Sequence, residues 1–396
     1  MRIMTIGASP YLLVRNGRMN ADIIRCLKDL GHEVSSACWH HDEGYFLPEP
    51  GTGIHSFEEN NGDKICDLYP FISHPEQSAP QVYEIMKRVA PEIVITIGDY
   101  KETDFLYAIK AMYPVFKWIA IVTVDCLYVN ENHADLLNYA DAIFSTTQFG
   151  SENLSMICGK YVPFVPYGPD LEVFKDNGNR VFDGKIQAIC TSKNALASNI
   201  GNLVKAVSRL EDISLHLHTN LFDPGEFDLT LLIDRNYARN VELTSEFVSI
   251  KDGVENDRLN EIYNNHNVVI DCSVKSATAL GMLEAMATGC IPIGVREGRV
   301  GEIINMMPKE FQFFVPSETY IGRMEEEFSV ATIKGLRETF QNMKNLVFSD
   351  AEKFKQASLS AIEVAKNLNH ILFLKKLEDA ILLVRSVESS ITLETF

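Results

Sequence analysis

Residues 280–293 read LGMLEAMATGCIPI and predict a helix that buries one carboxylate, followed by a strand. Apolar side chains surround Glu284 on all sides, so we expect the helix to lie in an interior or a cleft, where a carboxylate needs a partner. Gly289 should end the helix, and residues 290–295 are typical of a strand buried on both faces. Residues 267–273 predict a similar strand. Such a βαβ unit binds ligands at the carboxyl ends of its strands.

Length and charge limit the possible classes of protein. The 396 residues allow two domains, and the formal charge of −18 disfavours nucleic acid as a partner. The eight cysteines lack metal-like spacing and are expected to be reduced, structural thiols. No apolar run is long enough to span a bilayer, and no secretion signal opens the sequence. We therefore expect a cytoplasmic protein without a transmembrane segment.

The first half of the sequence predicts a doubly wound α/β domain. Residues 2–6 read as a strand, followed by a loop containing Gly7 and Gly17 and by a helix that ends near residue 30. Two further buried strands end in Asp99 and Asp125, which places both acids at carboxyl ends of strands. Residues 39–80 are rich in turn residues, and we interpret them as a loop region on the acceptor side.

The second half predicts another α/β domain, with helices at the end of the chain. Residues 175–185 carry Asn, Gly and Asp and are expected to link the domains, before a strand at 186–190. Residues 351–384 show helical spacing of apolar side chains. The predicted domains are 1–178, joined by a returning helix at about 370–396, and 179–369.

Residues 280–304 resemble the signature of the retaining, nucleotide-sugar-dependent glycosyltransferases with the GT-B fold. Segments 139–147 and 163–174 are similar to two further segments of that family. The resemblance implies an α/β protein of GT-B fold: two Rossmann-like domains face each other across a cleft, the first on the acceptor side and the second binding the donor, with C-terminal helices crossing back. The signature residues that match in order are Glu284, Ala285, Met286, Ala287, Gly289, Pro292, Gly298, Glu302, Ile303 and Ile304.

The same resemblance implies a donor site around Glu284, whose carboxylate would accept hydrogen bonds from the ribose hydroxyls. The alternative is a structural Glu held by backbone amides. Leu280 and Gly281, in the same helix, are placed at the donor too. Ser276 stands where the family has its first Glu, which contacts the donor sugar; a helix starting there would reach Glu284 after about 12 Å.

For the diphosphate, alignment places Lys193 where the family has a catalytic Arg, and Ser198 where it has a Lys. One cation is therefore altered and the other is missing. Lys275 and Arg296 are candidates to replace it, although Lys275 is equally interpreted as a solvated surface residue. Gly298, near a strand end, is expected to present backbone amides to the phosphates or the sugar.

On the acceptor side, Asp125 is nominated as the acceptor-orienting or catalytic residue, with a strand-end turn acid as the alternative. Gly17 and Asp99 are placed there as well. His40, His41, Asp42 and Glu43 are interpreted as a solvated turn rather than a metal cluster. His216 and His218 share one strand face and are interpreted as packing residues, so no metal is expected.

The sequence thus predicts a metal-independent, retaining glycosyltransferase. It would use a UDP- or GDP-sugar as co-substrate, with no other cofactor, and its acceptor would be a saccharide, a small molecule or, less favoured by the charge, modified DNA. Two alternatives stay open. One is a phage-type DNA base glycosyltransferase, and the other is a catalytically silent scaffold of the same fold, motivated by Ser198 and Ser276.

Overall fold

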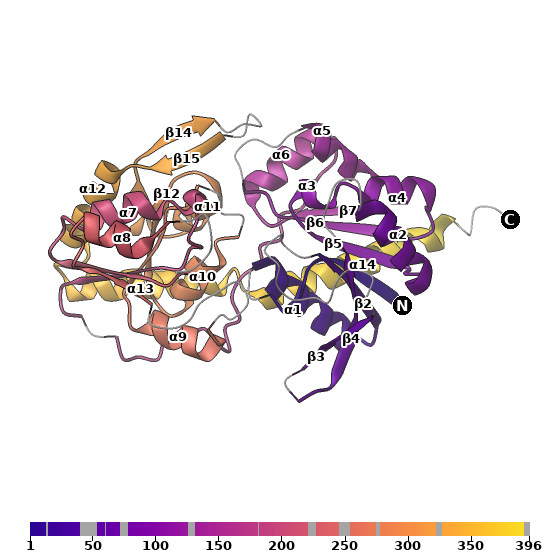
Figure 1. The fold of residues 1–396 in the computed structure, drawn as a ribbon, viewed down its shortest axis with the longest axis horizontal. Coiled ribbons are helices and arrows are strands. Elements are labelled where there is room, and N and C mark those ends of the chain that lie inside the picture. Colours follow the sequence, from indigo (N-terminus) through magenta and orange to yellow (C-terminus); the bar gives the residue numbers. More distant parts are fainter. Residues whose placement is uncertain are drawn as a thin grey trace. The chain divides into compact units, whose positions relative to one another are not determined.

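A computed structural model describes the chain except at residues 13–14, 40–53, 60, 72–77, 126–130, 181, 221–226, 245–253, 275–277, 322–326 and 392–396. The chain forms two compact units, each built around its own sheet (Figure 1). The first comprises Met1–Val124, Val129–Val165 and Ile371–Phe396, and the second Asp125–Tyr128 and Pro166–His370.

The first unit contains a seven-stranded sheet of order β3-β4-β2-β1-β5-β6-β7. All neighbouring strands are parallel except β3 and β4. β5 is buried along its whole length, as expected for a strand with helices on both faces. The strands are β1 (Arg2–Ala8), β2 (Glu33–Trp39), β3 (His55–Glu58), β4 (Lys64–Phe71), β5 (Ile93–Gly98), β6 (Lys117–Val122) and β7 (Ala142–Ser145).

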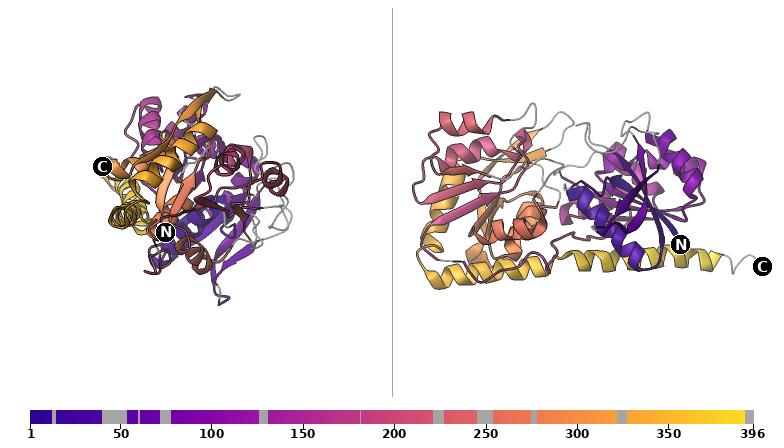
Figure 2. Two further views of the ribbon diagram at one scale, coloured as in Figure 1. Left: turned by 90° about the vertical axis from the view of Figure 1, so that its left-hand side faces the viewer. Right: turned by 60° about the horizontal axis from the view of Figure 1, so that its bottom comes forward.

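Helices cover this sheet. They are α1 (Arg15–Asp29), α2 (Ser78–Val89), α3 (Tyr100–Thr103), α4 (Leu106–Met112), α5 (Glu131–Ala134), the 3₁₀ helix η1 (Asp135–Tyr139), α6 (Gln148–Cys158) and α14 (His370–Ile391). From Ile371 onward, α14 belongs to the first unit and lies beside α1 (Figure 2). Burial raises the pKa of the Cys26 thiol on α1, and the nearby carboxylate of Glu378 on α14 adds to the shift.

Two local expectations for the first unit are wrong. Gly7 lies within β1 and Gly17 within α1 rather than in a loop. A Cβ on Gly17 would lie 2.3 Å from the carbonyl oxygen of Leu12, so the glycine lets the preceding loop pack against the helix. The loop-rich range 39–80 also contains β3 and β4, because alternate residues of β4 pack into the core. The acceptor-side role of this range stays a prediction.

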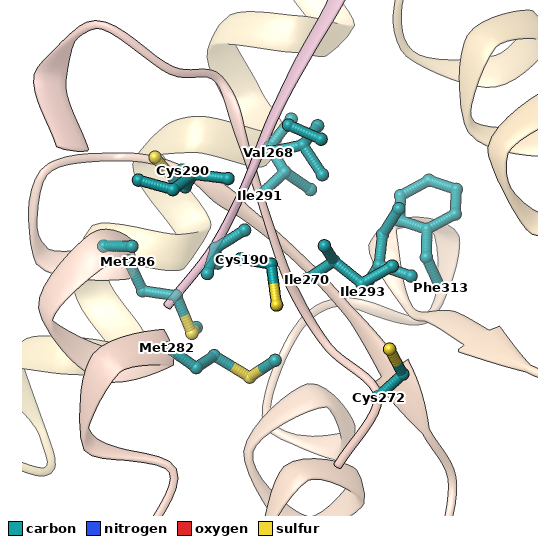
Figure 3. Packing of buried hydrophobic residues seen from close by; sticks show 14 of the residues in the cluster. Cys190, Val268, Ile270, Cys272, Met282, Met286, Cys290, Ile291, Ile293 and Phe313 are labelled. Atoms are coloured by element: carbon teal, nitrogen blue, oxygen red, sulfur yellow. The ribbon is translucent and has the colours of Figure 1, made fainter. Parts of the chain in front are cut away.

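The second unit contains a six-stranded parallel sheet of order β10-β9-β8-β11-β12-β13. Residues of β11 (Val268–Asp271) and β12 (Ile291–Val295) share one core cluster with Met282 and Met286 of α10 (Leu280–Ala287), as Figure 3 shows. β14 and β15 form a separate antiparallel pair. The strands are β8 (Ile186–Cys190), β9 (Ile213–Leu217), β10 (Val241–Leu243), β11 (Val268–Asp271), β12 (Ile291–Val295), β13 (Phe313–Val315), β14 (Ser317–Ile321) and β15 (Glu327–Ala331).

The helices of the second unit are η2 (Leu196–Ser198), α7 (Ile200–Val207), α8 (Leu229–Arg235), α9 (Asn256–Asn264), α10 (Leu280–Ala287), α11 (Gly298–Asn305), η3 (Lys309–Phe311), α12 (Ile333–Leu346) and α13 (Ala351–Lys366). α10 packs against α9 and α13. Among the described helices, none combines the length and the apolar character needed to cross a membrane.

The segment predicted to link the domains, 175–185, is bound to the second unit. The side chain of Asn264 on α9 donates to the carbonyl oxygen of Lys175 at 3.0 Å and accepts from the amide of Asn177 at 3.0 Å. Arg180 then donates to the carbonyl oxygens of His266 at 2.9 Å and of Thr288 at 2.7 Å. Apart from Asp125–Tyr128, the second unit runs from Pro166 to His370, so this stretch starts before the predicted boundary at residues 178 and 179.

The described cysteines are free thiols, and all are buried except Cys26, which is half-buried. Burial raises the pKa of Cys190 to about 11, and burial with the neighbouring Asp67 charge raises that of Cys66 to about 12. Thiols with such pKa values are poor nucleophiles near neutral pH, which agrees with the prediction of structural cysteines.

Three histidines of the second unit pack together. The rings of His216 and His218 stack with centroids 6.2 Å apart, and the His266 ring meets His216 edge-on at 5.1 Å. Nδ1 of His266 lies 2.7 Å from the carbonyl oxygen of Ile262 and therefore carries the proton. Within the described ranges, no group of three or more His, Cys, Asp or Glu side chains is arranged to hold a metal ion.

This cluster should make folding pH-dependent. Burial, together with the charges of His216, Arg180 and His218, lowers the pKa of His266 to about 4, although its hydrogen bond to Ile262 opposes the shift. The unfolded chain takes up this proton first, so His266 stabilises the fold above about pH 6.5, and the contribution is lost as the pH falls toward 4. At pH 5 the loss should be about 2 kcal/mol.

The measurement is urea unfolding at pH 5 and 7.5, followed by far-UV circular dichroism. The His266→Gln variant should lose less stability between these two pH values than the unmodified protein does. His32→Gln is the control, because His32 is more exposed and its lowered pKa should matter less. An equal pH dependence in the unmodified protein and in His266→Gln would contradict the prediction.

Candidate active site

Glu284 lies in the middle of α10, and its side chain is only 2% exposed. β11, α10 and β12 form the predicted βαβ unit, with β11 and β12 parallel. Gly289 follows the helix with a φ of +97°, as expected for the residue that ends it. The carbonyl oxygen of Thr288 accepts from Arg180, and that of Gly289 accepts from Ser358 Oγ at 2.8 Å.

The start of this helix differs from the expectation. α10 begins at Leu280 rather than near Ser276, because Ala279 adopts a left-handed conformation with a φ of +48°. A non-glycine residue pays a steric penalty of about 1–2 kcal/mol in that region. Ala279 therefore interrupts the single helix that was expected to lead up to Glu284. Lys275 and Ser276 themselves lie outside the described residues, so their donor-binding roles stay predictions.

The carboxylate of Glu284 has a partner on the neighbouring helix. The hydroxyl of Tyr263 on α9 donates to Glu284 Oε2 at 3.2 Å. Tyr263 is 1% exposed, and its ring packs against Phe174 with centroids 6.1 Å apart. The sequence does not indicate this role of Tyr263, since an aromatic residue on an amphipathic helix gives no sign that its hydroxyl meets a carboxylate 21 residues away.

Gly281 brings α10 close to the end of β8. A Cβ at this position would lie 2.4 Å from Thr191 Oγ1 and 3.4 Å from the Tyr263 hydroxyl. Any larger residue would therefore push the helix away from the turn that follows β8. Gly281 thus lies next to Glu284's partner, in the region predicted for the donor, and Leu280 beside it is buried.

Polar groups gather where β8 and β11 end. Ser192 Oγ and Ser273 Oγ lie 3.1 Å apart, and the amide of Ser273 donates to Asp271 Oδ1 at 2.9 Å. Lys193 follows Ser192 and is exposed. Carboxyl ends of parallel strands are the usual place for ligands in such sheets. Lys193 is therefore positioned at this edge, as the sequence analysis expected.

Two arginines with different environments follow β12, Arg296 in the turn and Arg299 in α11. Arg296 is exposed, and its guanidinium lies 4.0 Å from the centroid of the Phe314 ring. Gly298 starts α11 with a φ of +67°. Arg299 is 1% exposed and pairs with Glu302 at 3.1 Å; burial lowers its guanidinium pKa, and Glu302 opposes that shift. Of these two cations, Arg296 is the one accessible to a ligand.

Ser198, which stands at the family's Lys position, is buried at the end of η2. Its carbonyl oxygen accepts a long contact from Cys272 Sγ at 3.9 Å. The residue therefore serves the packing of the turn, and it supplies no charge to the site.

The candidate residues of the first half of the chain have different surroundings. Asp125 is half-buried just beyond the carboxyl end of β6, as predicted. Asp99 caps α3: its Oδ1 accepts from the amide of Lys101 at 2.9 Å, and Glu102 Oε2 accepts from the amide of Asp99 at 2.9 Å. This capping box gives Asp99 a structural role that was not predicted, although the Asp-x-x-Glu spacing indicates it. His40, His41, Asp42 and Glu43 lie outside the described residues.

Comparison with solved structures identifies the architecture. Sucrose-phosphate synthase from Thermosynechococcus elongatus is similar over 98% of this chain and 100% of its own, with a TM-score of 0.73 and 14% identity. The α,α-trehalose 6-phosphate synthase from Burkholderia multivorans covers 100% and 98%, with a TM-score of 0.70 and 8% identity. Anabaena HepE in complex with UDP covers 96% and 99%, with a TM-score of 0.66 and 12% identity.

No family model matches the sequence, and a search of curated proteins gave no match either. The likeness is therefore one of fold, extending over nearly the full length of this chain and of each of these proteins. Two units with parallel sheets, together with this likeness, confirm the predicted fold class: the protein has the GT-B fold of glycosyltransferases.

Proposed function

We propose that the protein is a metal-independent, retaining glycosyltransferase that moves a sugar from a nucleotide-sugar donor to an acceptor hydroxyl. The observation that carries the proposal is the carboxylate of Glu284, buried in the second unit and hydrogen-bonded by Tyr263, on a helix whose Gly281 packs against Thr191 after β8. A carboxylate in such a position more often serves a ligand than the fold alone.

The ligands of similar structures support a nucleoside diphosphate donor. HepE is complexed with UDP, a starch synthase IV catalytic domain from Arabidopsis thaliana with ADP and acarbose, and an Escherichia coli trehalose-6-phosphate protein with UDP-2-fluoro glucose. For this chain we propose a UDP- or GDP-sugar. Glu284 would accept from the ribose hydroxyls, while Lys193 and Arg296 would face the diphosphate.

In this proposal the protein contributes positioning and charge. The leaving phosphate oxygen accepts the proton of the acceptor hydroxyl as an oxocarbenium-like centre forms, so the new bond lies on the same face as the old one. Lys193 stabilises the charge that develops on the leaving diphosphate. Asp125 orients the acceptor hydroxyl. The anomeric configuration of the product, measured by NMR, tests retention.

The first test is thermal unfolding against UDP, GDP, ADP, CDP and TDP and their common sugar conjugates. A ligand that binds only the folded protein stabilises it by about 2.7 kcal/mol at a hundredfold excess over its dissociation constant. We expect the UDP or the GDP series to raise the unfolding midpoint and the other series to leave it nearly unchanged. The absence of a shift with every nucleotide would contradict the proposed function.

A catalytically silent scaffold is the second candidate, and the burial of Ser198 favours it. Ser198 is buried and stands where the family that the sequence resembles has a Lys. A bound diphosphate would therefore meet one positive side chain fewer than in that family. Binding of a sugar nucleotide without transfer or hydrolysis would support the scaffold, whereas turnover of any sugar nucleotide would exclude it. DNA as the acceptor is disfavoured by the charge of −18.

A further inference from the structure

The second unit contains a cavity of about 320 Å³ between α9 and the strands β8, β9 and β10. It is lined by Gln187, Ser214, His216, Glu242, Arg258 and His266, with Ile262 adding an apolar side chain. Gln187 and Ser214 are each the second residue of their strand. The cavity therefore does not occupy the carboxyl ends of the strands, where Thr191 and Ser192 follow β8.

This cavity is distinct from the site around Glu284. Neither Glu284 nor Tyr263 lines it, although Ile262, the neighbour of Tyr263 on α9, does. From β9, Ser214, Leu215 and His216 line the cavity, and Leu215 is otherwise buried in the core together with Ile213 and Leu217. An alternation of polar and apolar residues is expected for a strand with one face open to solvent or ligand.

The charges that line the cavity are balanced. Glu242 supplies one carboxylate and Arg258 one guanidinium, which also pairs with Glu261 at 2.7 Å. Burial lowers the pKa of both His216 and His266, so both rings are neutral near pH 7. A phosphate would meet no surplus positive charge. A metal ion would lack a ligand set, since the described residues contain no suitable group of three.

Hydrogen-bonding groups, in contrast, are plentiful. Gln187 and Ser214 donate and accept, Glu242 accepts, and Arg258 donates. Nδ1 of His266 already donates to Ile262, which leaves Nε2 as an acceptor. Nε2 of His216 is buried and has no hydrogen-bond partner among the described residues. A buried polar atom of this kind is stabilised by a ligand that reaches it.

We infer that this cavity binds a small, neutral, polyhydroxylated molecule of about monosaccharide size, at a site separate from that of Glu284. Its volume lies at the lower end of the range of about 300–1,000 Å³ for ligand sites, which restricts the occupant to a small molecule. Hydroxyl groups donate and accept at once and so match a lining of mixed donors and acceptors. The inference does not depend on the proposed transferase activity.

The test follows the imidazole C–H signals of His216 and His266 by NMR, assigned with His216→Gln and His266→Gln. The probes are methyl α-glucoside and N-acetylglucosamine, each raised to about 10 mM, above the millimolar dissociation constants of weak sites. Inorganic phosphate, glycine and Zn²⁺ are the comparison ligands. We expect saturable shifts of both histidines with at least one neutral sugar and none with the three comparison ligands.

Two variants locate the binding. Ser214→Trp fills the cavity from an exposed strand position and should abolish the shifts, whereas Thr319→Trp, on exposed β14 of the same unit, should leave them unchanged. Glu242→Gln, a milder change, should raise the dissociation constant about tenfold. Glu284→Ala should not affect these shifts, which separates this site from the proposed donor site.

Several results would overturn the inference. If only phosphate, glycine or Zn²⁺ shifts the two histidine signals, the proposed class of ligand is wrong. Shifts that persist in Ser214→Trp would place the binding elsewhere, and so would shifts that Glu284→Ala abolishes. If neither sugar moves the His216 and His266 signals at the highest concentration, the cavity is not a binding site for this class of molecule.

Discussion

Replacing Glu284 with Ala is expected to weaken binding of the nucleotide-sugar donor by about 1.5–3 kcal/mol, or about 10- to 150-fold in dissociation constant. The reason is that the carboxylate, held by Tyr263 at 3.2 Å, would accept hydrogen bonds from the ribose, and hydrogen bonds to a charged group are the stronger kind. Isothermal titration with the nucleotide that shifts the unfolding midpoint gives the dissociation constant directly.

Matched variants separate a binding role of Glu284 from a structural one. Tyr263→Phe keeps the buried ring and removes only the hydroxyl, so it should weaken donor binding less than Glu284→Ala does. Glu338→Gln removes an exposed carboxylate from α12 of the same unit and should leave the dissociation constant unchanged. If Glu284→Ala remains folded and binds the donor as tightly as the unmodified protein, the site assignment is wrong.

Replacing Glu302 with Gln is expected to destabilise the second unit by about 3 kcal/mol. The guanidinium of Arg299 is 1% exposed and pairs with Glu302 at 3.1 Å. Removing the carboxylate takes this counter-charge away from a buried guanidinium, and breaking a buried pair on one side costs more than the worth of the pair itself. Urea unfolding followed by far-UV circular dichroism measures the loss.

The double variant Arg299→Met/Glu302→Leu is the control. It removes both charges at similar volume and should recover most of the stability lost by Glu302→Gln. Both tryptophans, Trp39 and Trp118, lie in the first unit, so tryptophan fluorescence should change less than circular dichroism in the Glu302 variant. If Glu302→Gln lowers the free energy of unfolding by less than about 1 kcal/mol, the Arg299–Glu302 pair behaves as a solvent-exposed ion pair and the prediction is wrong.

Much of the fold follows from local sequence patterns. The apolar runs of β5, β6, β11 and β12 mark strands buried on both faces, and the predicted strand 186–190 is β8 (Ile186–Cys190). Hydrophobic periodicity records which side of an element faces the core, so it survives in the sequence even at 14% identity to a protein of the same fold. Gly289 at the end of α10 is a local signal of the same kind.

The predictions for the start of α10 and for the range 39–80, which contains two strands, were wrong. Ala279 is left-handed although alanine favours the right-handed helix. β4 pairs with β2, whose residues lie some 30 positions earlier in the chain, and this long-range pairing outweighs the local preference. Asp99 differs from these cases, because its capping partner Glu102 lies close by in the sequence. The spacing of the two residues by itself indicates a capping box.

The sequence by itself determined the α/β class, the βαβ unit and the burial of Glu284, because each depends on the spacing of neighbouring side chains. Only the tertiary structure decided what surrounds that carboxylate: Tyr263 as its hydrogen-bond donor and Gly281 against Thr191. It also decided that Arg299 is buried with Glu302 while Arg296 remains exposed. Tyr263 and Glu284 belong to different helices, and the packing of helices onto the sheet, which no local period records, brings them together. Arg299 and Glu302 share α11, but their burial likewise depends on how that helix packs.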